Sequence, residues 1–332
     1  MFSAFSFRDN ANDYRTTALR RVRDGADVSG KVVVVTGATG AMGKELSFAF
    51  YQGGATVVMT GRSMEKATKA KEEVLARQVP ESEDFAGKEG GSIVPMTLDL
   101  GDYDSIQAFV KDLKSKFPKV YALVNNAGAI PGSSFRESKY GNETTFQANF
   151  LSTVILTELM IPLLKGTQGS RIVNVSSMSH KDATNPVKWD VIPSNAETFG
   201  GYNKDYAESK WLLTSYTSHL SRTHKDILSV SADPGVSPDS KMWDEQIAIV
   251  RFMARYVFYY LTKKTPQAAG CAARLVVAKN EELTNGGYYE SGVLSAPRSD
   301  CESVEEWAKA AAVLERSLPE ALKANMMKSL AE

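Results

Sequence analysis

The chain has 332 residues, of which 43% are hydrophobic and 23% charged, so it can bury a sizeable core. Its formal net charge is zero, and this lack of a basic excess argues against nucleic acid as a partner. The two cysteines, Cys271 and Cys301, do not have the spacing of a metal site, and we expect free thiols in a reducing compartment.

Residues 1–28 are predicted to form an appended arm, with a helix around residues 10–23 that lies on the domain or on a partner. The arm lacks the apolar segment of a secretory signal, and its three aspartates argue against an organelle presequence. No apolar run reaches the ~18 residues that are needed to span a bilayer. The expected location is the cytoplasm, with organelle targeting or contact with a membrane surface as alternatives.

Residues 31–45, KVVVVTGATGAMGKE, predict a strand, a glycine-rich turn and the start of a helix. Four consecutive valines are typical of a strand that is buried on both faces of a parallel sheet. The glycines let the backbone approach a pyrophosphate, and the following helix offers it free N–H groups. A P-loop is excluded, because five residues separate Gly37 from Gly43 and Glu45 replaces the hydroxyl that binds Mg²⁺. The alternative is a tight turn without a ligand.

Strands and helices alternate over the next 200 residues. The further predicted strands are 55–60, 92–100, 120–128, 171–177 and 227–235. The further predicted helices are 64–78, 102–116, 141–165, 203–223, 302–316 and 319–330. This alternation predicts an α/β fold with a doubly wound parallel sheet, the Rossmann fold, in a single domain. The expected domain is 29–318, followed by a C-terminal helical tail at 319–332.

Ligands of such sheets bind beyond the C-terminal ends of the strands, where several polar side chains are expected. Tyr206 and Lys210 are four residues apart on one helix, so their side chains share a face. A tyrosine needs its pKa lowered by about three units to act as a base near neutral pH, and a neighbouring ammonium favours this. Ser177 ends a buried strand at the same edge, where its hydroxyl can bind a substrate oxygen. Asn149 lies in an otherwise apolar helix and needs a partner.

Each of these residues also has a purely structural interpretation. Tyr206 and Lys210 can be a surface pair on an amphipathic helix, Ser177 a strand-end serine, and Asn149 a satisfied structural amide. Their co-occurrence with the glycine-rich turn favours the functional interpretation.

The motifs together resemble the short-chain dehydrogenase/reductase family. They occur in one order: TGATGAMG at 36–43, LDL at 98–100, NNAG at 125–128, Asn149, VNVSS at 173–177, YAESK at 206–210 and DPG at 233–235. Within the family the resemblance is to the retinol-dehydrogenase-like and WW-domain-oxidoreductase-like group. The features that carry it are Gly61-Arg62, SSMSH at 176–180, KTPQAAG at 264–270, NGGYYESG at 285–292 and Trp307.

The resemblance implies a role for each residue. Tyr206 gives or takes the proton, and Lys210 lowers the pKa of Tyr206 and holds the nicotinamide ribose. Ser177 orients the carbonyl or alcohol, and Asn149 supports proton relay. The remaining cofactor contacts implied are Thr36, Gly37, Gly40, Ala41, Met42, Gly43, Asp99, Leu100, Asn126, Ala127, Gly128, Pro234, Gly235 and Val236. Ala41 stands where the commonest form of the family has glycine.

The end of the second strand indicates which cofactor binds. Enzymes that use NAD place a carboxylate there for the ribose 2′-hydroxyl, but Thr60-Gly61 offers none. Arg62 follows, and its guanidinium suits a 2′-phosphate. We therefore expect NADP(H), the alternative being that Arg62 only caps a surface loop.

The expected function is that of an NADP(H)-dependent oxidoreductase that interconverts a carbonyl and an alcohol on a lipophilic molecule such as a retinoid or steroid. An apolar helix predicted within 238–262 can cover the active site, lie on a membrane surface or pack against another subunit. The alternatives are a dinucleotide-binding structural or regulatory subunit of a larger assembly, and an NADP-sensing protein. A homo-oligomer is also left open, and no metal is expected.

Overall fold

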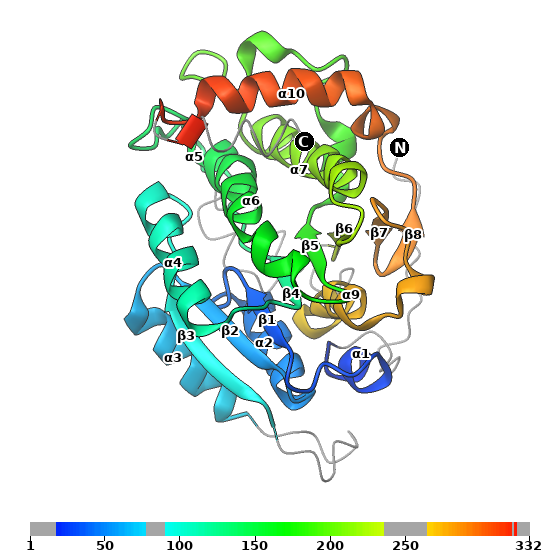
Figure 1. Cartoon of the computed structure of the whole chain (residues 1–332). Coiled ribbons are helices and arrows are strands. Elements are labelled where there is room, and N and C mark those ends of the chain that lie inside the picture. The colour runs from blue at the N-terminus through cyan, green and yellow to red at the C-terminus, as the bar shows by residue number, and fades with distance from the viewer. Residues whose placement is uncertain (1–17, 78–89, 236–263, 321, 324–332) are drawn as a thin grey trace.

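The fold is built on one sheet whose strands follow the order β3-β2-β1-β4-β5-β6-β7-β8 (Figure 1). The structure is a computed structural model and describes residues 18–77, 90–235, 264–320 and 322–323. The strands are β1 (Val32–Val35), β2 (Thr56–Gly61), β3 (Ser92–Thr97), β4 (Ala122–Asn125), β5 (Arg171–Val175), β6 (Leu228–Asp233), β7 (Tyr288–Glu290) and β8 (Val293–Ser295). All neighbours pair in parallel except β7 and β8, which are antiparallel.

Helices cover both faces of the sheet. They are α1 (Ala18–Asp24), α2 (Ala41–Gln52), α3 (Met64–Leu75), α4 (Tyr103–Lys116), α5 (Thr144–Phe146), α6 (Ser152–Lys165), α7 (Asp205–Thr223), α9 (Thr265–Val277) and α10 (Val304–Ser317). Val33 and Val35 belong to the core beneath α2 and α9, whereas Val34 belongs to the core beneath α4, α6 and α7. The predicted doubly wound parallel sheet, with its first strand buried on both faces, is therefore confirmed.

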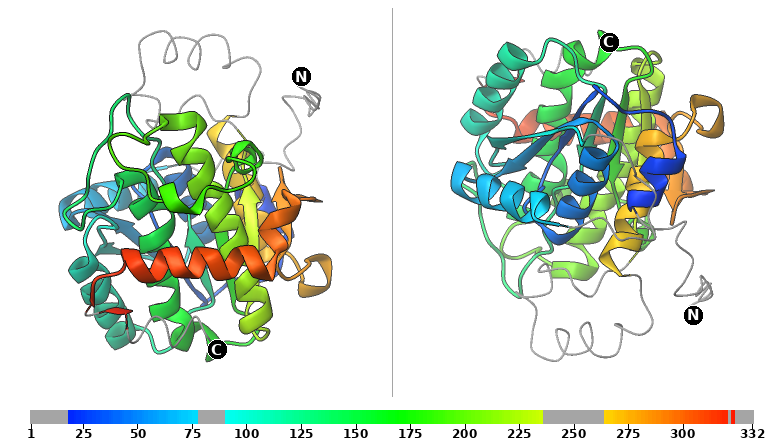
Figure 2. Two further views of the ribbon diagram at one scale, coloured as in Figure 1. Left: turned by 90° about the horizontal axis from the view of Figure 1, so that it is seen from above. Right: turned by 90° about the horizontal axis from the view of Figure 1, so that it is seen from below.

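The two ends of the described chain pack on this framework. α1 lies beside α2 and α9, so tightly that a Cβ on Gly25 would come within 2.3 Å of a Val277 methyl group. α10 packs on the outside of α7 (Figure 2). At this contact Trp307 stacks on Tyr216 with ring centroids 5.6 Å apart. Most of the helix predicted at 319–330, the helix within 238–262 and the start of the helix at 10–23 lie outside the described residues.

Several predicted boundaries are wrong. The strand expected at 92–100 ends at Thr97, because Asp99 folds into a turn in which its Oδ1 accepts a hydrogen bond from the Gly101 N–H. The strand expected at 120–128 ends at Asn125, and the next N–H turns back to Val124. Three elements, α9, β7 and β8, were not among the predicted strands and helices.

One helical run, Thr144–Lys165, joins α5, a π-helical segment (Gln147–Leu151) and α6. Contrary to the expectation from sequence, this run is long and apolar enough to cross a membrane. Of its most apolar window, however, 83% is buried inside the fold, and α6 packs against α4. Within the described part of the chain it is a core helix.

Candidate active site

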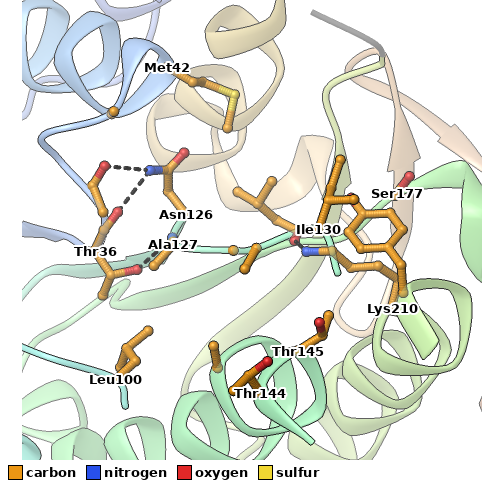
Figure 3. A pocket seen from close by; sticks show the side chains of 18 of the residues that line it. Thr36, Met42, Leu100, Asn126, Ala127, Ile130, Thr144, Thr145, Ser177 and Lys210 are labelled. Carbon is orange, nitrogen blue, oxygen red and sulfur yellow. Dashed lines mark hydrogen bonds between the residues drawn. The ribbon is translucent and has the colours of Figure 1, made fainter. Parts of the chain in front are cut away.

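A cleft of about 710 Å³ opens at the C-terminal ends of the parallel strands. All the predicted site residues that the structure describes line it except Asn149, and Val236 lies outside the described residues. The topology thus brings together residues from the six loops that follow β1 to β6 and from α7 (Figure 3).

The glycine-rich turn forms one end of the cleft. Gly37 has a φ of +61°, and a Cβ there would lie 2.9 Å from the Cα of Ala127. A Cβ on Gly43 would lie 2.4 Å from the carbonyl oxygen of Gly37. α2 begins at Ala41, and its N-cap, Gly40, has no side chain to cap the first turn. The turn therefore presents backbone N–H groups at a helix N-terminus, an arrangement that binds anions.

The segment after β4 holds this turn in place. The Asn126 side-chain amide donates to the carbonyl oxygens of Thr36, at 2.8 Å, and Gly37, at 3.3 Å. The Thr36 hydroxyl in turn accepts from the Ala127 N–H at 2.9 Å (Figure 3). These bonds join the ends of β1 and β4, so Thr36, Asn126 and Ala127 position the turn as well as line the cleft.

Tyr206 and Lys210 form the other end of the cleft and are almost fully buried. The Lys210 Nζ donates to the Val175 carbonyl oxygen at 2.8 Å and lies 5.6 Å from the centre of the Tyr206 ring. Burial lowers the pKa of Lys210 to about 8, and the nearby Asp233 carboxylate partly opposes this by raising it.

The pKa of Tyr206 does not follow the expectation from sequence. Burial raises it above the ordinary value, and the nearby Ser177 hydroxyl only partly opposes the rise. The protein groups therefore keep the phenol protonated at neutral pH, because a phenolate is poorly solvated in this buried position. A protonated phenol is the form that can donate a proton to a carbonyl oxygen.

Asn149 lies behind the cleft, in the π-helical segment. Its Oδ1 accepts from the Ala129 N–H at 2.7 Å, and its Nδ2 donates to the Ala129 carbonyl oxygen at 2.9 Å and to Ser209 Oγ at 3.1 Å. These bonds tie the segment after β4 to α7, and Gly128 leaves room between Asn149 and Lys210. Asn149 thus has the contacts of a satisfied amide beside the site, and its part in proton relay stays a prediction.

Arg62 occupies the cleft edge at the end of β2. It is exposed, and it makes no hydrogen bond or ion pair with another described residue. Asp99 and Leu100 line the same part of the cleft. An exposed guanidinium here is available to an anionic group.

Comparison with known proteins agrees with this geometry. A family model described as short chain dehydrogenase matches residues 31–187. The chain belongs to the short-chain dehydrogenase/reductase family, and within it to the retinol-dehydrogenase-like group.

The relatives and solved structures differ in how much they cover. WW domain-containing oxidoreductase of Gallus gallus is 32% identical over 233 residues, which are 67% of this chain but only 52% of that protein. Retinol dehydrogenase 11 of Homo sapiens is 28% identical over 262 residues, covering 78% of this chain and 77% of the relative. The Pseudomonas aeruginosa RhlG/NADP complex matches with a TM-score of 0.60 at 18% identity, covering 80% and 95% of the two chains. At that identity the likeness shows the fold alone.

This short-chain dehydrogenase has cleft residues that the sequence analysis did not assign to the site. Asp233 is buried, and its carboxylate accepts from the Gly235 N–H at 2.9 Å and the Tyr288 hydroxyl at 3.2 Å. Its only sequence signal is its place before Pro234. Thr265 and Ala268 also line the cleft, from α9. No periodic pattern in the sequence predicted this position.

Proposed function

We propose that this short-chain dehydrogenase/reductase interconverts a carbonyl and an alcohol with NADP(H), on a lipophilic substrate such as a retinoid or steroid. The observation that carries the proposal is the buried Tyr206–Lys210 pair, which shares a cleft with Ser177 and with the glycine-rich turn at the N-terminus of α2. The name of the retinol dehydrogenase relative supports the substrate class. We further propose a cytoplasmic protein.

The cleft fits an extended dinucleotide. The space left by Gly37 and Gly43 and the uncapped start of α2 would receive the pyrophosphate. Arg62 would hold a 2′-phosphate, and Lys210 the ribose of the nicotinamide. The other proposed contacts are Asp99 and Leu100 at the adenine, Asn126, Ala127 and Gly128 at the adenosine ribose, and Pro234, Gly235 and Val236 at the carboxamide. When bound, the cofactor supplies or accepts the hydride.

The chain itself handles the substrate oxygen and its proton. In reduction Tyr206 would donate its phenolic proton to the carbonyl oxygen of the substrate, and in oxidation the phenolate would take the proton back. The Ser177 hydroxyl donates a hydrogen bond to the same oxygen and fixes its position. The charged Lys210 stabilises the phenolate that remains on Tyr206 after reduction.

The test is NADPH consumption against a panel of aldehydes and ketones that includes retinal and steroid ketones, with NADH in parallel. We expect turnover by the wild type, and a loss of about 10²–10⁴-fold in Tyr206→Phe at nearly unchanged NADPH affinity. Tyr51→Phe, on α2 and outside the cleft, is the matched control. Equal turnover in Tyr206→Phe would remove the mechanism. Tight NADPH binding with no turnover on any substrate would instead favour a subunit or sensor.

A further inference from the structure

A second tyrosine lies directly behind the proposed catalytic pair. The Tyr202 ring stacks on the Tyr206 ring, with centroids 5.1 Å apart and an interplanar angle of 14°. Their hydroxyls do not meet but are joined through two serines. The Tyr202 hydroxyl lies 3.2 Å from Ser179 Oγ, and Ser179 Oγ lies 3.2 Å from Ser177 Oγ. Ser177 in turn is close enough to Tyr206 to lower the pKa of its phenol.

The four residues Tyr202, Ser179, Ser177 and Tyr206 form a row, and two of them do not contact the cleft directly. Ser177 and Tyr206 line the cleft, whereas Ser179 and Tyr202 are not among the described residues that line it. Ser179 is buried, with 6% of its surface exposed. Among the described residues, an influence of Ser179 or Tyr202 on the cleft contents passes through Ser177 or Tyr206.

The direction of the hydrogen bonds decides what this influence is. In the structure the Ser177 hydroxyl donates to Ser179 Oγ, so its hydrogen points away from the cleft. To bind a substrate oxygen, Ser177 must turn that hydrogen toward the cleft. A hydroxyl both donates and accepts, so Ser179 can then donate to Ser177 while accepting from Tyr202. Successive hydrogen bonds of this kind strengthen one another.

The backbone of the serine turn is held by its own hydrogen bonds, one of which runs from the Ser179 N–H to Ser177 Oγ at 3.2 Å and fixes the position of that oxygen. The Ser177 carbonyl oxygen lies 2.8 Å from Nδ1 of the buried His180, and the Arg298 N–H donates to Nε2 of the same ring at 3.1 Å. Nε2 is thus the acceptor, which leaves Nδ1–H as the donor to the backbone carbonyl oxygen of Ser177. Burial lowers the pKa of His180 to about 4, so this arrangement persists at neutral pH. With the oxygen of Ser177 held in place, rotation about its C–O bond is enough to redirect the hydroxyl hydrogen.

We propose that Ser179 and Tyr202 are positioning residues that turn the Ser177 hydroxyl toward the substrate oxygen and polarise it. The proposal rests on the proposed function, because it assigns the row to the reaction of the same site. It predicts that loss of the Tyr202 hydroxyl lowers kcat only while the Ser177 hydroxyl is present to donate a hydrogen bond to the substrate oxygen.

The test is a double-mutant cycle of Tyr202→Phe and Ser177→Ala, measured by steady-state reduction with NADPH. We expect Tyr202→Phe to lower kcat about tenfold in the wild-type background, the loss that corresponds to one hydrogen bond. The KM for NADPH should stay within about twofold. In the Ser177→Ala background the same substitution should cause no further loss, because the group through which Tyr202 acts is gone. Ser179→Ala should behave like Tyr202→Phe, and combining the two should add nothing.

The outcomes separate the two proposals. An equal loss from Tyr202→Phe in both backgrounds would show a general structural effect and overturn the positioning role. Wild-type kcat in both Tyr202→Phe and Ser179→Ala would overturn it as well, while leaving the proposed function intact. A wild type without turnover on any substrate would overturn the proposed function and this inference with it. Melting temperatures of all variants, with Tyr51→Phe as the control, identify losses that come from unfolding.

Discussion

The two ends of the cleft are formed by different kinds of groups, backbone at one end and buried side chains at the other. At the glycine-rich end the site consists of backbone groups and of space that side chains do not occupy, with the exposed Arg62 at its edge. At the catalytic end it consists of buried side chains, with Lys210 bonded to Val175 and Ser177 to the row behind it. We therefore expect cofactor binding at the first end to be lost when atoms are added, and turnover at the second end to be lost when a hydroxyl or a charge is removed.

The difference also concerns stability. A glycine-lined turn costs the fold mainly conformational freedom. A buried ammonium disfavours the folded state, and the lowered pKa of Lys210 expresses that cost. Functional sites commonly retain such destabilising groups because the chemistry needs them.

The largest effect is expected at the catalytic end. Lys210→Met should lower kcat/KM by about 10²-fold or more, because Tyr206 loses the cation that stabilises its phenolate. The melting temperature of the cofactor-free protein should not fall, since the variant no longer buries a charge. Steady-state kinetics and calorimetry on the same preparations measure both quantities. A variant that loses activity in proportion to its loss of folded protein would contradict this prediction.

The pH dependence provides a second check on Lys210. Its pKa in the free protein is about 8, below the ordinary 10.5, so it loses its charge as the pH rises through about 8. The kcat/KM of reduction should fall over that range in the wild type, and this limb should be missing in Lys210→Met. Because the folded-state pKa is the lower one, this group makes the protein more stable as the pH rises from about 8 toward 10.5. The expected midpoint of the fall in kcat/KM is about pH 8. A wild-type kcat/KM that does not change across this pH would contradict the role assigned to Lys210.

The glycine-rich end was the easier one to predict from sequence. Four valines and the glycine spacing specify a strand, a turn and a helix locally, and the parallel sheet then follows from the alternation of elements. The same rule placed the loops after β2, β4, β5 and β6 at one edge, where the structure has the cleft. The residues that line it were therefore accessible to sequence reasoning.

At the proposed catalytic end the sequence predicted the residues that line the cleft but not those that lie behind them. Tyr206 and Lys210 share a helix face, which spacing alone reveals, but Tyr202 and Ser179 meet through tertiary packing across 23 residues of sequence. β7 and β8 have three residues each, too few for an alternating pattern. The raised pKa of Tyr206 depends on burial, which the sequence does not display.

A smaller effect is expected from adding one methyl group at the glycine-rich end. Gly37→Ala should weaken NADPH binding by about tenfold or more, because the residue has a φ of +61° and its new Cβ would meet Ala127 at 2.9 Å. Gly30→Ala is the matched control, since Gly30 has a φ of +69° but no atom within 4 Å of the added Cβ, and it lies outside the cleft. Fluorescence titration with NADPH measures both affinities. An equal loss in the two variants would mean that backbone strain alone, and not the fit of the turn, is responsible.

The smallest effect should appear at Arg62, the one charged side chain proposed for cofactor choice. Arg62→Ala should weaken NADPH binding by about tenfold and leave NADH binding unchanged, because only NADPH carries the 2′-phosphate that a charge-assisted hydrogen bond would hold. Lys66→Ala removes an equal charge from the exposed face of α3, outside the cleft, and should change neither affinity. If Arg62→Ala weakens both cofactors equally, the guanidinium contributes a general field and does not select NADPH. The glycine-rich end would then bind its ligand through the backbone alone, which would make the contrast between the two ends complete.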